Sequence, residues 1–107
     1  MPGRAPRLHR TDANQGEVMA WFAGLGWAVC DTSELGRGFP DLVIGWGDTN
    51  DPKRWINVLI EVKADGGRLT EPEQAFHRRW PGPLEIVRGW DDVLRVHEKW
   101  RNVRTRA

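Results

Sequence analysis

Asp41, Glu61 and Lys63 have the residue types and spacing from which a catalytic centre can be built. Glu61 and Lys63 stand on either side of Val62, at the end of the apolar run INVLIEVK. Alternate residues of a strand point to the same face, so Glu61 and Lys63 are expected to share one face. The other face is expected to be a β-branched core surface made of Ile56, Val58, Ile60 and Val62. Alone, Glu61 and Lys63 are explained equally well by a structural ion pair.

Asp41 adds a second carboxylate to this pattern. It opens the apolar segment DLVIGW, which a turn-rich connection separates from the long strand. An antiparallel hairpin roughly symmetric about Asp51 places Asp41 beside Glu61. Two carboxylates that close repel each other unless a cation lies between them. Mg²⁺ is the expected ion because it takes one or two carboxylates and keeps several waters, and Mn²⁺ is expected to substitute for it.

Such an ion can lower the pKa of a bound water and neutralise charge on a phosphoryl oxygen. Lys63 beside that water can orient it or stabilise the charged transition state. The glycines that flank the site leave room for the close approach of a DNA strand: Gly36, Gly38, Gly66 and Gly67. These residue types therefore indicate metal-assisted phosphodiester hydrolysis.

The rest of the chain predicts an α/β fold. Asp12 and Gln15 resemble a capping box that opens a helix, whose apolar stripe is Val18, Trp21, Phe22 and Leu25. Strands are expected at 27–31, 41–46, 55–64 and 84–88, a helix at 71–80 after the capping box of Thr70 and Glu73, and a last helix capped by Asp91. The order α-β-β-β-α-β-α predicts a small mixed sheet flanked by helices, with a meander and one parallel partner.

The chain length of 107 residues favours a single domain, at 12–100, with a basic arm at 1–11 and a basic tail at 101–107. The net charge is only +1, but six of the thirteen arginines lie in the first ten and last seven residues. They suit phosphate contact, although solvated termini explain them equally well. Cys30 is the only cysteine and is expected to be buried. No apolar run suits a membrane span or a signal peptide, so we expect a cytoplasmic protein.

Several segments resemble a known nuclease superfamily. FPDLVIGW followed by IEVKAD resembles the PD-(D/E)XK signature, with Pro40-Asp41 as the first half and Glu61-Val62-Lys63 as the second. The expected element order is that of the superfamily's restriction-endonuclease-like core. Within it, ELGRGFPDLVIG, EVKAD and LTEPEQAFHRRW resemble the small VRR-NUC and Holliday-junction-resolvase-like nucleases, many of them carried by phages. The resemblance covers about residues 12–95.

The resemblance implies roles for particular residues. Asp41 and Glu61 would bind the metal, with the backbone carbonyl of Val62 as a further ligand and Lys63 beside the attacking water. Such nucleases often add an acidic residue from the first helix. Glu17 is the candidate here.

Further residues stay open between a functional role and a place on a plain surface. Gln15 is an alternative to Glu17, and a solvated helix face explains Glu17 as well. Gln74 matches a family glutamine expected to support Lys63 or the DNA backbone, but also suits an ordinary helix surface. Residues 77–79 are most simply an exposed polar patch, although on the helix that follows the site they could touch phosphate.

The sequence thus predicts a Mg²⁺-dependent endodeoxyribonuclease. The resemblance implies a preference for branched DNA such as Holliday junctions, in a prokaryotic or phage-infected cell. Two symmetric cuts need two sites, which predicts a homodimer with Trp90 and Trp100 near its interface. A general or nicking nuclease and a non-catalytic DNA-binding protein with this fold are the alternatives, and the intact Asp41, Glu61 and Lys63 disfavour the second.

Overall fold

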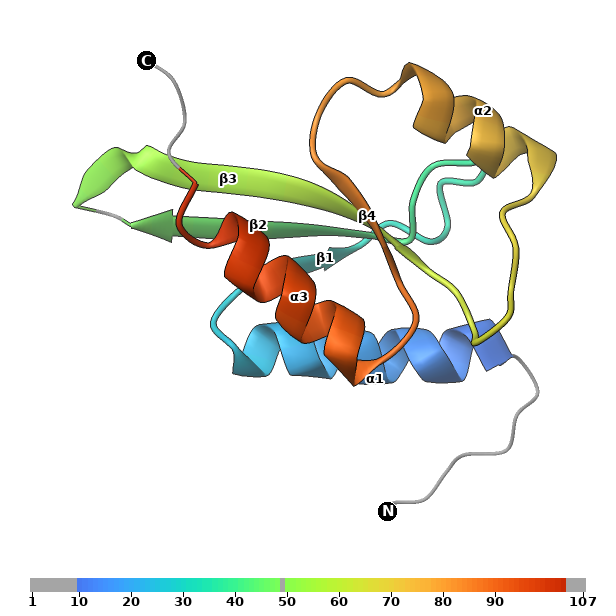
Figure 1. The fold of residues 1–107 in the computed structure, drawn as a ribbon, viewed down its shortest axis with the longest axis horizontal. Helices are drawn as coiled ribbons and strands as arrows, with labels where there is room; N and C mark the ends of the chain where they lie inside the picture. Colours follow the sequence, from blue (N-terminus) through green and yellow to red (C-terminus); the bar gives the residue numbers. More distant parts are fainter. Residues whose placement is uncertain (1–9, 49, 104–107) are drawn as a thin grey trace.

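The computed structural model describes residues 10–48 and 50–103. Along this part of the chain the elements are α1 (Arg10–Gly24), β1 (Ala28–Asp31), β2 (Leu42–Asp48), β3 (Asp51–Val62), α2 (Glu71–Arg79), β4 (Leu84–Val87) and α3 (Trp90–Trp100). The four strands form one sheet in the order β1-β2-β3-β4 (Figure 1). The first three are antiparallel and β4 is parallel to β3, which confirms the predicted mixed sheet.

The hairpin of β2 and β3 has the predicted register. Leu42 lies opposite Ile60 and Ile44 lies opposite Val58, with an irregularity only between Trp46 and Asp48 near the turn. One step beyond the Leu42–Ile60 pair, Asp41 comes opposite Glu61. The two carboxylates therefore reach the same end and the same face of the hairpin because of the strand register alone.

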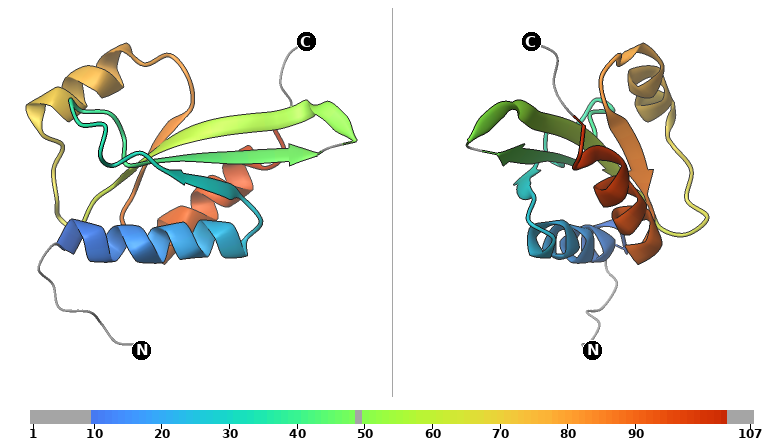
Figure 2. Two further views of the ribbon diagram at one scale, coloured as in Figure 1. Left: turned by 180° about the vertical axis from the view of Figure 1, so that it is seen from behind. Right: turned by 60° about the vertical axis from the view of Figure 1, so that its left-hand side comes forward.

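The core lies between one face of the sheet and two helices. Val58, Ile60 and Val62 of β3 are fully buried, which confirms the predicted core face. They pack with apolar residues of α1, β2, β4 and α3, among them Phe22 and Val93. Figures 1 and 2 show α1 and α3 on this side of the sheet and α2 on the other. None of the helices in residues 10–48 and 50–103 is long and apolar enough to cross a membrane.

Two of the three predicted helix caps are wrong. Asp12 lies within α1, which already includes Arg10. Helix α3 has Gly89 as its N-cap, not Asp91, and the side chain of Asp92 instead accepts a hydrogen bond from the backbone N–H of Arg88. The Thr70–Glu73 capping box at α2 is confirmed, with both of its reciprocal hydrogen bonds present.

Cys30 is exposed, so its predicted burial is wrong. It lies on β1, an edge strand of the sheet, where neighbouring residues point to opposite faces. Val29 takes the core side, and Cys30 takes the side that α1 and α3 do not cover. The alternation of a short strand was too brief to show which residue faces the core.

The loop before Asp41 is fixed by close packing on α2. Gly38 has a φ of +85°, and a Cβ at this position would overlap the backbone carbonyl of Pro72 in the first turn of α2. Next to it, the ring of Phe39 meets that of Phe76 edge-on, with centroids 5.2 Å apart. This contact joins the segment that leads into Asp41 to the helix on the far side of the sheet.

Gly38→Ala is therefore expected to lower the free energy of unfolding by about 2–3 kcal/mol. Gly36→Ala is the matched control, because Gly36 also has a positive φ, +71°, but a Cβ there meets nothing within 4 Å. The control should lose only about 1 kcal/mol, from backbone strain alone. Urea denaturation of both variants measures the difference, and equal losses would show that packing of the loop on α2 does not matter.

Candidate active site

Asp41 is held in place by hydrogen bonds from Thr32, which follows β1, and from the end of β3. Its main-chain carbonyl accepts a hydrogen bond from the N–H of Thr32, and the Thr32 hydroxyl donates to the carbonyl of Pro40 at 2.8 Å. The carboxylate oxygen Oδ2 of Asp41 accepts a hydrogen bond from the backbone N–H of Val62 at 2.9 Å. Asp41 is thus tied to the residue that separates Glu61 from Lys63.

Glu61 is a buried carboxyl group beside this aspartate. It is only 1% exposed, and its Oε1 atom has no hydrogen-bond partner. Burial raises the pKa of Glu61 to about 9, with the negative charge of Asp41 and a hydrogen bond shared with the Asp41 carboxyl group as further causes. The two carboxyl groups are therefore close enough to share a proton, or a cation in its place.

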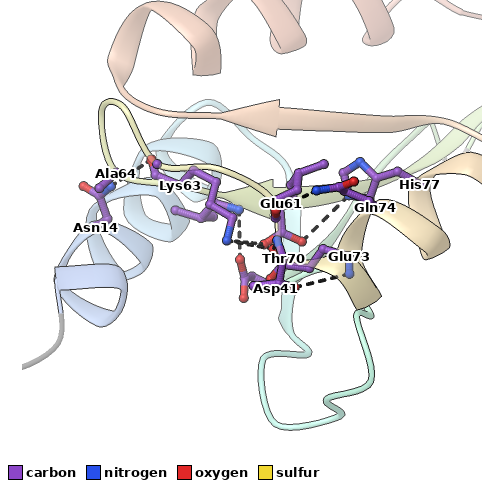
Figure 3. Close-up of polar contacts among 12 residues, drawn as sticks. Asn14, Asp41, Glu61, Lys63, Ala64, Thr70, Glu73, Gln74 and His77 are labelled. Carbon is purple, nitrogen blue, oxygen red and sulfur yellow. Dashed lines mark hydrogen bonds and ion pairs between the residues drawn. The ribbon is translucent and has the colours of Figure 1, made fainter.

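Lys63 is held mainly by Glu73 of α2, not by Glu61. Its Nζ atom lies 2.8 Å from Glu73 Oε1 but 3.9 Å from Glu61 Oε2 (Figure 3). Burial alone would raise the pKa of Glu73, but hydrogen bonds from Lys63 and Thr70 outweigh it and the pKa is lowered. Glu73 is therefore an ionised partner that fixes the end of Lys63.

The sequence identified Glu73 only as a capping residue. Its Oε1 atom accepts both the Thr70 backbone N–H, at 2.8 Å, and the ammonium of Lys63. The capping box thus also determines where the lysine lies. The segment TEPE carried part of this information, because the side chain of a capping-box glutamate reaches back toward the N-cap residue. The sequence did not show which face of α2 meets the sheet.

His77, one helical turn beyond Glu73, is the second site residue that the sequence missed. Its side chain is 14% exposed, and its Nε2 atom lies 3.9 Å from Glu61 Oε1. Burial lowers its pKa, so the imidazole is neutral near neutral pH. The predicted exposed patch at 77–79 is therefore wrong for His77, whereas Arg78 and Arg79 are exposed.

Gln74 lies on the exposed side of α2. Its side-chain amide donates a hydrogen bond to the backbone carbonyl of Leu69 at 3.0 Å, which braces the loop before the helix. Figure 3 shows Gln74 close to the site, but the lysine-supporting position is taken by Glu73. A role for Gln74 toward the DNA backbone stays a prediction.

Helix α1 reaches the site through Asn14. The side-chain amide of Asn14 donates to the backbone carbonyl of Lys63 at 3.2 Å.

Gln15 is buried and donates to Asp31 Oδ1 at 2.9 Å, whereas Glu17 is exposed. The structure does not bring Glu17 into the contacts among Asp41, Glu61 and Lys63, and its assignment as a metal ligand stays a prediction. Asn14 lies four residues before the core residue Val18, which places it on the same helix face but does not show which strand residue it meets.

The donor set fits one hard divalent cation held by two carboxylates. Within residues 10–48 and 50–103, no group of three or more His, Cys, Asp or Glu residues could hold a metal ion. Asp41 and the buried Glu61 nevertheless form an acidic pair, in which Glu61 has an unpartnered oxygen and a raised pKa that a cation would lower. Two carboxylates with the remaining positions left to water and phosphate suit Mg²⁺. The carbonyl of Val62 stays a predicted further ligand.

The fold and this site together define a class of protein. A mixed four-stranded sheet with helices on both sides carries Pro40-Asp41 before β2 and Glu61-Val62-Lys63 at the end of β3, which is the core of a PD-(D/E)XK-type nuclease. The model of the VRR-NUC domain family matches residues 13–79, a range that includes every site residue described above. The chain therefore belongs to the VRR-NUC family of PD-(D/E)XK-like nuclease domains. Comparison with curated proteins found no match, and comparison with solved structures found none.

Glu73→Gln is expected to slow nucleic-acid cleavage by about 10–100-fold, because Lys63 loses the charged partner that fixes its position. Glutamine also serves in a capping box, so α2 should retain its start and the protein its stability. Glu71→Gln, an exposed change in the same helical turn, is the matched control. Single-turnover cleavage rates test this, and equal rates in the two variants would show that Glu73 only caps the helix.

Proposed function

We propose that this nuclease is a Mg²⁺-dependent endonuclease that hydrolyses DNA phosphodiester bonds and prefers branched DNA such as Holliday junctions. Mn²⁺ is expected to replace Mg²⁺. The observation that carries the proposal is the pair of Asp41 and the buried Glu61 beside a lysine whose end is fixed by Glu73. A lone structural ion pair would need neither the second carboxylate nor the second partner for Lys63.

The residues of the chain have distinct tasks in this reaction. Asp41 and Glu61 would hold the cation, which supplies charge neutralisation at the phosphate and a lower pKa for the attacking water. Asp41 stays oriented through its hydrogen bond from the Val62 N–H. Lys63, fixed by Glu73, can donate a hydrogen bond to the attacking water or to a phosphate oxygen as negative charge builds there. The bond from the water oxygen to phosphorus forms while the bond to the leaving DNA oxygen breaks.

Exposed arginines on the segments that flank the site support contact with a nucleic-acid backbone. They lie in the loop before Asp41, in the loop after Lys63 and on α2, and they are Arg37, Arg68, Arg78 and Arg79. Guanidinium groups bind phosphate oxygens in a bidentate manner, and such contacts position a strand without reading its sequence. Most of the predicted basic arm and tail lies outside the described residues. Arg101, at the end of α3, pairs with Glu98 at 3.3 Å.

The homodimer belongs to the same proposal, since paired cuts across a junction need two sites. Of the two tryptophans expected at the interface, Trp90 is 42% exposed and meets Trp21 edge-on. Trp100 instead packs against the core and donates from Nε1 to Glu85 at 2.8 Å. Trp90 is therefore the better candidate for a contact between copies. We place the protein in the cytoplasm of a prokaryotic or phage-infected cell.

A cleavage panel tests the preference for branched DNA. Holliday junction, flap, single-stranded and linear duplex DNA of one common sequence are incubated with Mg²⁺ and with EDTA. We expect Mg²⁺-dependent cutting, with the junction cut at least ~10-fold faster than the linear duplex. Equal rates on all duplexes would replace the junction preference by a general nuclease, and single-strand cuts in linear duplex would indicate a nicking enzyme. No cleavage of any substrate would overturn the enzymatic proposal.

A further inference from the structure

Two buried polar atoms face each other across the site without a hydrogen bond. In the part of the chain that the structure describes, the buried side-chain atoms that lack a partner are Glu61 Oε1, His77 Nε2 and Arg101 Nε. The first two are 3.9 Å apart, which is longer than a hydrogen bond. An unsatisfied buried polar group costs about 1–3 kcal/mol, so two such atoms at one place need an explanation.

The chemistry of the two atoms is complementary. An imidazole nitrogen that carries a proton is a donor, and a carboxylate oxygen is an acceptor. A small rotation of either side chain would bring them within hydrogen-bond distance. Figure 3 shows the ring of His77 directed from α2 toward Glu61, on the side of the carboxyl group away from Lys63.

The spacing of α2 against β3 makes this pairing part of a pattern. Glu73 and His77 are four residues apart in a helix, a rise of about 6 Å. Glu61 and Lys63 are two residues apart in a strand, a rise of about 6.6 Å. One helical turn therefore matches one repeat of the strand, so that Glu73 meets Lys63 while His77 meets Glu61. The first of these pairs is fully formed at 2.8 Å.

We propose that His77 is a positioning residue whose Nε2–H donates a hydrogen bond to Glu61 Oε1 when the carboxylate holds a cation. The inference rests on the proposed function, because it assigns Glu61 as a metal ligand. With Oε1 fixed by His77, the other oxygen of Glu61 is directed toward Asp41 and Lys63. Metal-binding carboxylates are commonly held by such outer hydrogen bonds, which tune affinity for the ion. Direct ligation by His77 is not favoured, since it forms no three-residue metal group with Asp41 and Glu61.

Two substitutions at this position separate a hydrogen-bond role from packing. His77→Leu keeps apolar volume but removes the donor, and His77→Gln retains an amide donor in nearly the same place. Glu71→Gln, exposed on the same helix, is the control. Calorimetric titration with Mn²⁺ alone gives the affinity, single-turnover cleavage gives the rate, and thermal unfolding without metal shows that each variant is folded.

We expect His77→Leu to weaken Mn²⁺ binding and slow cleavage by about 10–100-fold, and His77→Gln to restore both to within about five-fold of wild type. Wild-type affinity in His77→Leu would overturn the proposal. Equal loss in His77→Leu and His77→Gln would also overturn it, because the imidazole itself would then be needed.

If the wild type binds Mn²⁺ but cuts no DNA, the nuclease proposal fails while weaker binding by His77→Leu still supports the positioning role. A wild type that binds no Mn²⁺ overturns both.

Discussion

Asp41→Asn is expected to reduce DNA cleavage by at least about 100-fold and leave the fold intact. The asparagine side chain keeps an oxygen that can accept the Val62 N–H, as Asp41 Oδ2 does at 2.9 Å, so the strand end should keep its geometry. What is lost is the negative charge that, with Glu61, makes the site attractive to a divalent cation. Single-turnover cleavage of the best substrate in saturating Mg²⁺ measures the effect.

Asp91→Asn is the matched control for this variant, because Asp91 is an exposed aspartate in the first turn of α3. It should cleave at the wild-type rate. Undiminished cleavage by Asp41→Asn would show that the reaction takes place elsewhere on the molecule.

Glu61→Gln is expected to stabilise the metal-free protein increasingly as the pH rises. The pKa of Glu61 is about 9 in the folded protein and near 4.5 when unfolded, so the folded state binds the proton more tightly. The tighter proton binding by Glu61 stabilises the folded state, and this contribution to the free energy of unfolding is fully present below pH 4.5. It is lost as the pH rises toward 9, by up to about 1.4 kcal/mol per pH unit. Glutamine has no such proton, and between pH 5 and pH 8 its advantage should grow by roughly 2–4 kcal/mol.

Urea denaturation in EDTA at pH 5, 6.5 and 8 measures this difference in the free energy of unfolding. Glu98→Gln, at a side chain that is 64% exposed, is the control and should show no such trend. Saturating Mg²⁺ should then stabilise the wild type by about 2.7 kcal/mol at a concentration of 100 times Kd, and Glu61→Gln far less. A difference between Glu61→Gln and wild type that does not change with pH would contradict the burial of an uncompensated carboxyl group.

The central strands could be predicted from the sequence because their patterns leave few choices. The β-branched alternation of Ile56 to Val62 determines which face of β3 is buried, and a nearly symmetric hairpin then places Asp41 opposite Glu61. A shift by one residue would expose the whole core face. The capping box of Thr70 and Glu73 was equally readable, since its reciprocal hydrogen bonds are local in the chain.

Contacts between distant elements could not be predicted in the same way. Glu73 reaches Lys63 and His77 approaches Glu61 only because α2 lies against the second face of β3, and the sequence does not state how the helix is rotated about its axis. The same limit applies to α1, where the polar residue that touches the site is Asn14 and the expected Glu17 is exposed. Cys30 shows the limit for a short edge strand, whose four residues carry too little alternation to fix a face.

The claim that Asp41 and Glu61 share a divalent cation is tested most directly by the protons released when the metal-free protein binds Mn²⁺. Calorimetric titration at pH 7.5 in two buffers of different ionisation enthalpy gives that number for the wild type and for Glu61→Gln. Because Glu61 carries a proton at this pH without metal, the wild type should release about one proton per bound ion. Glu61→Gln should bind far more weakly. Wild-type binding without proton release, or Mn²⁺ binding of undiminished affinity in Glu61→Gln, would contradict a shared cation at this site.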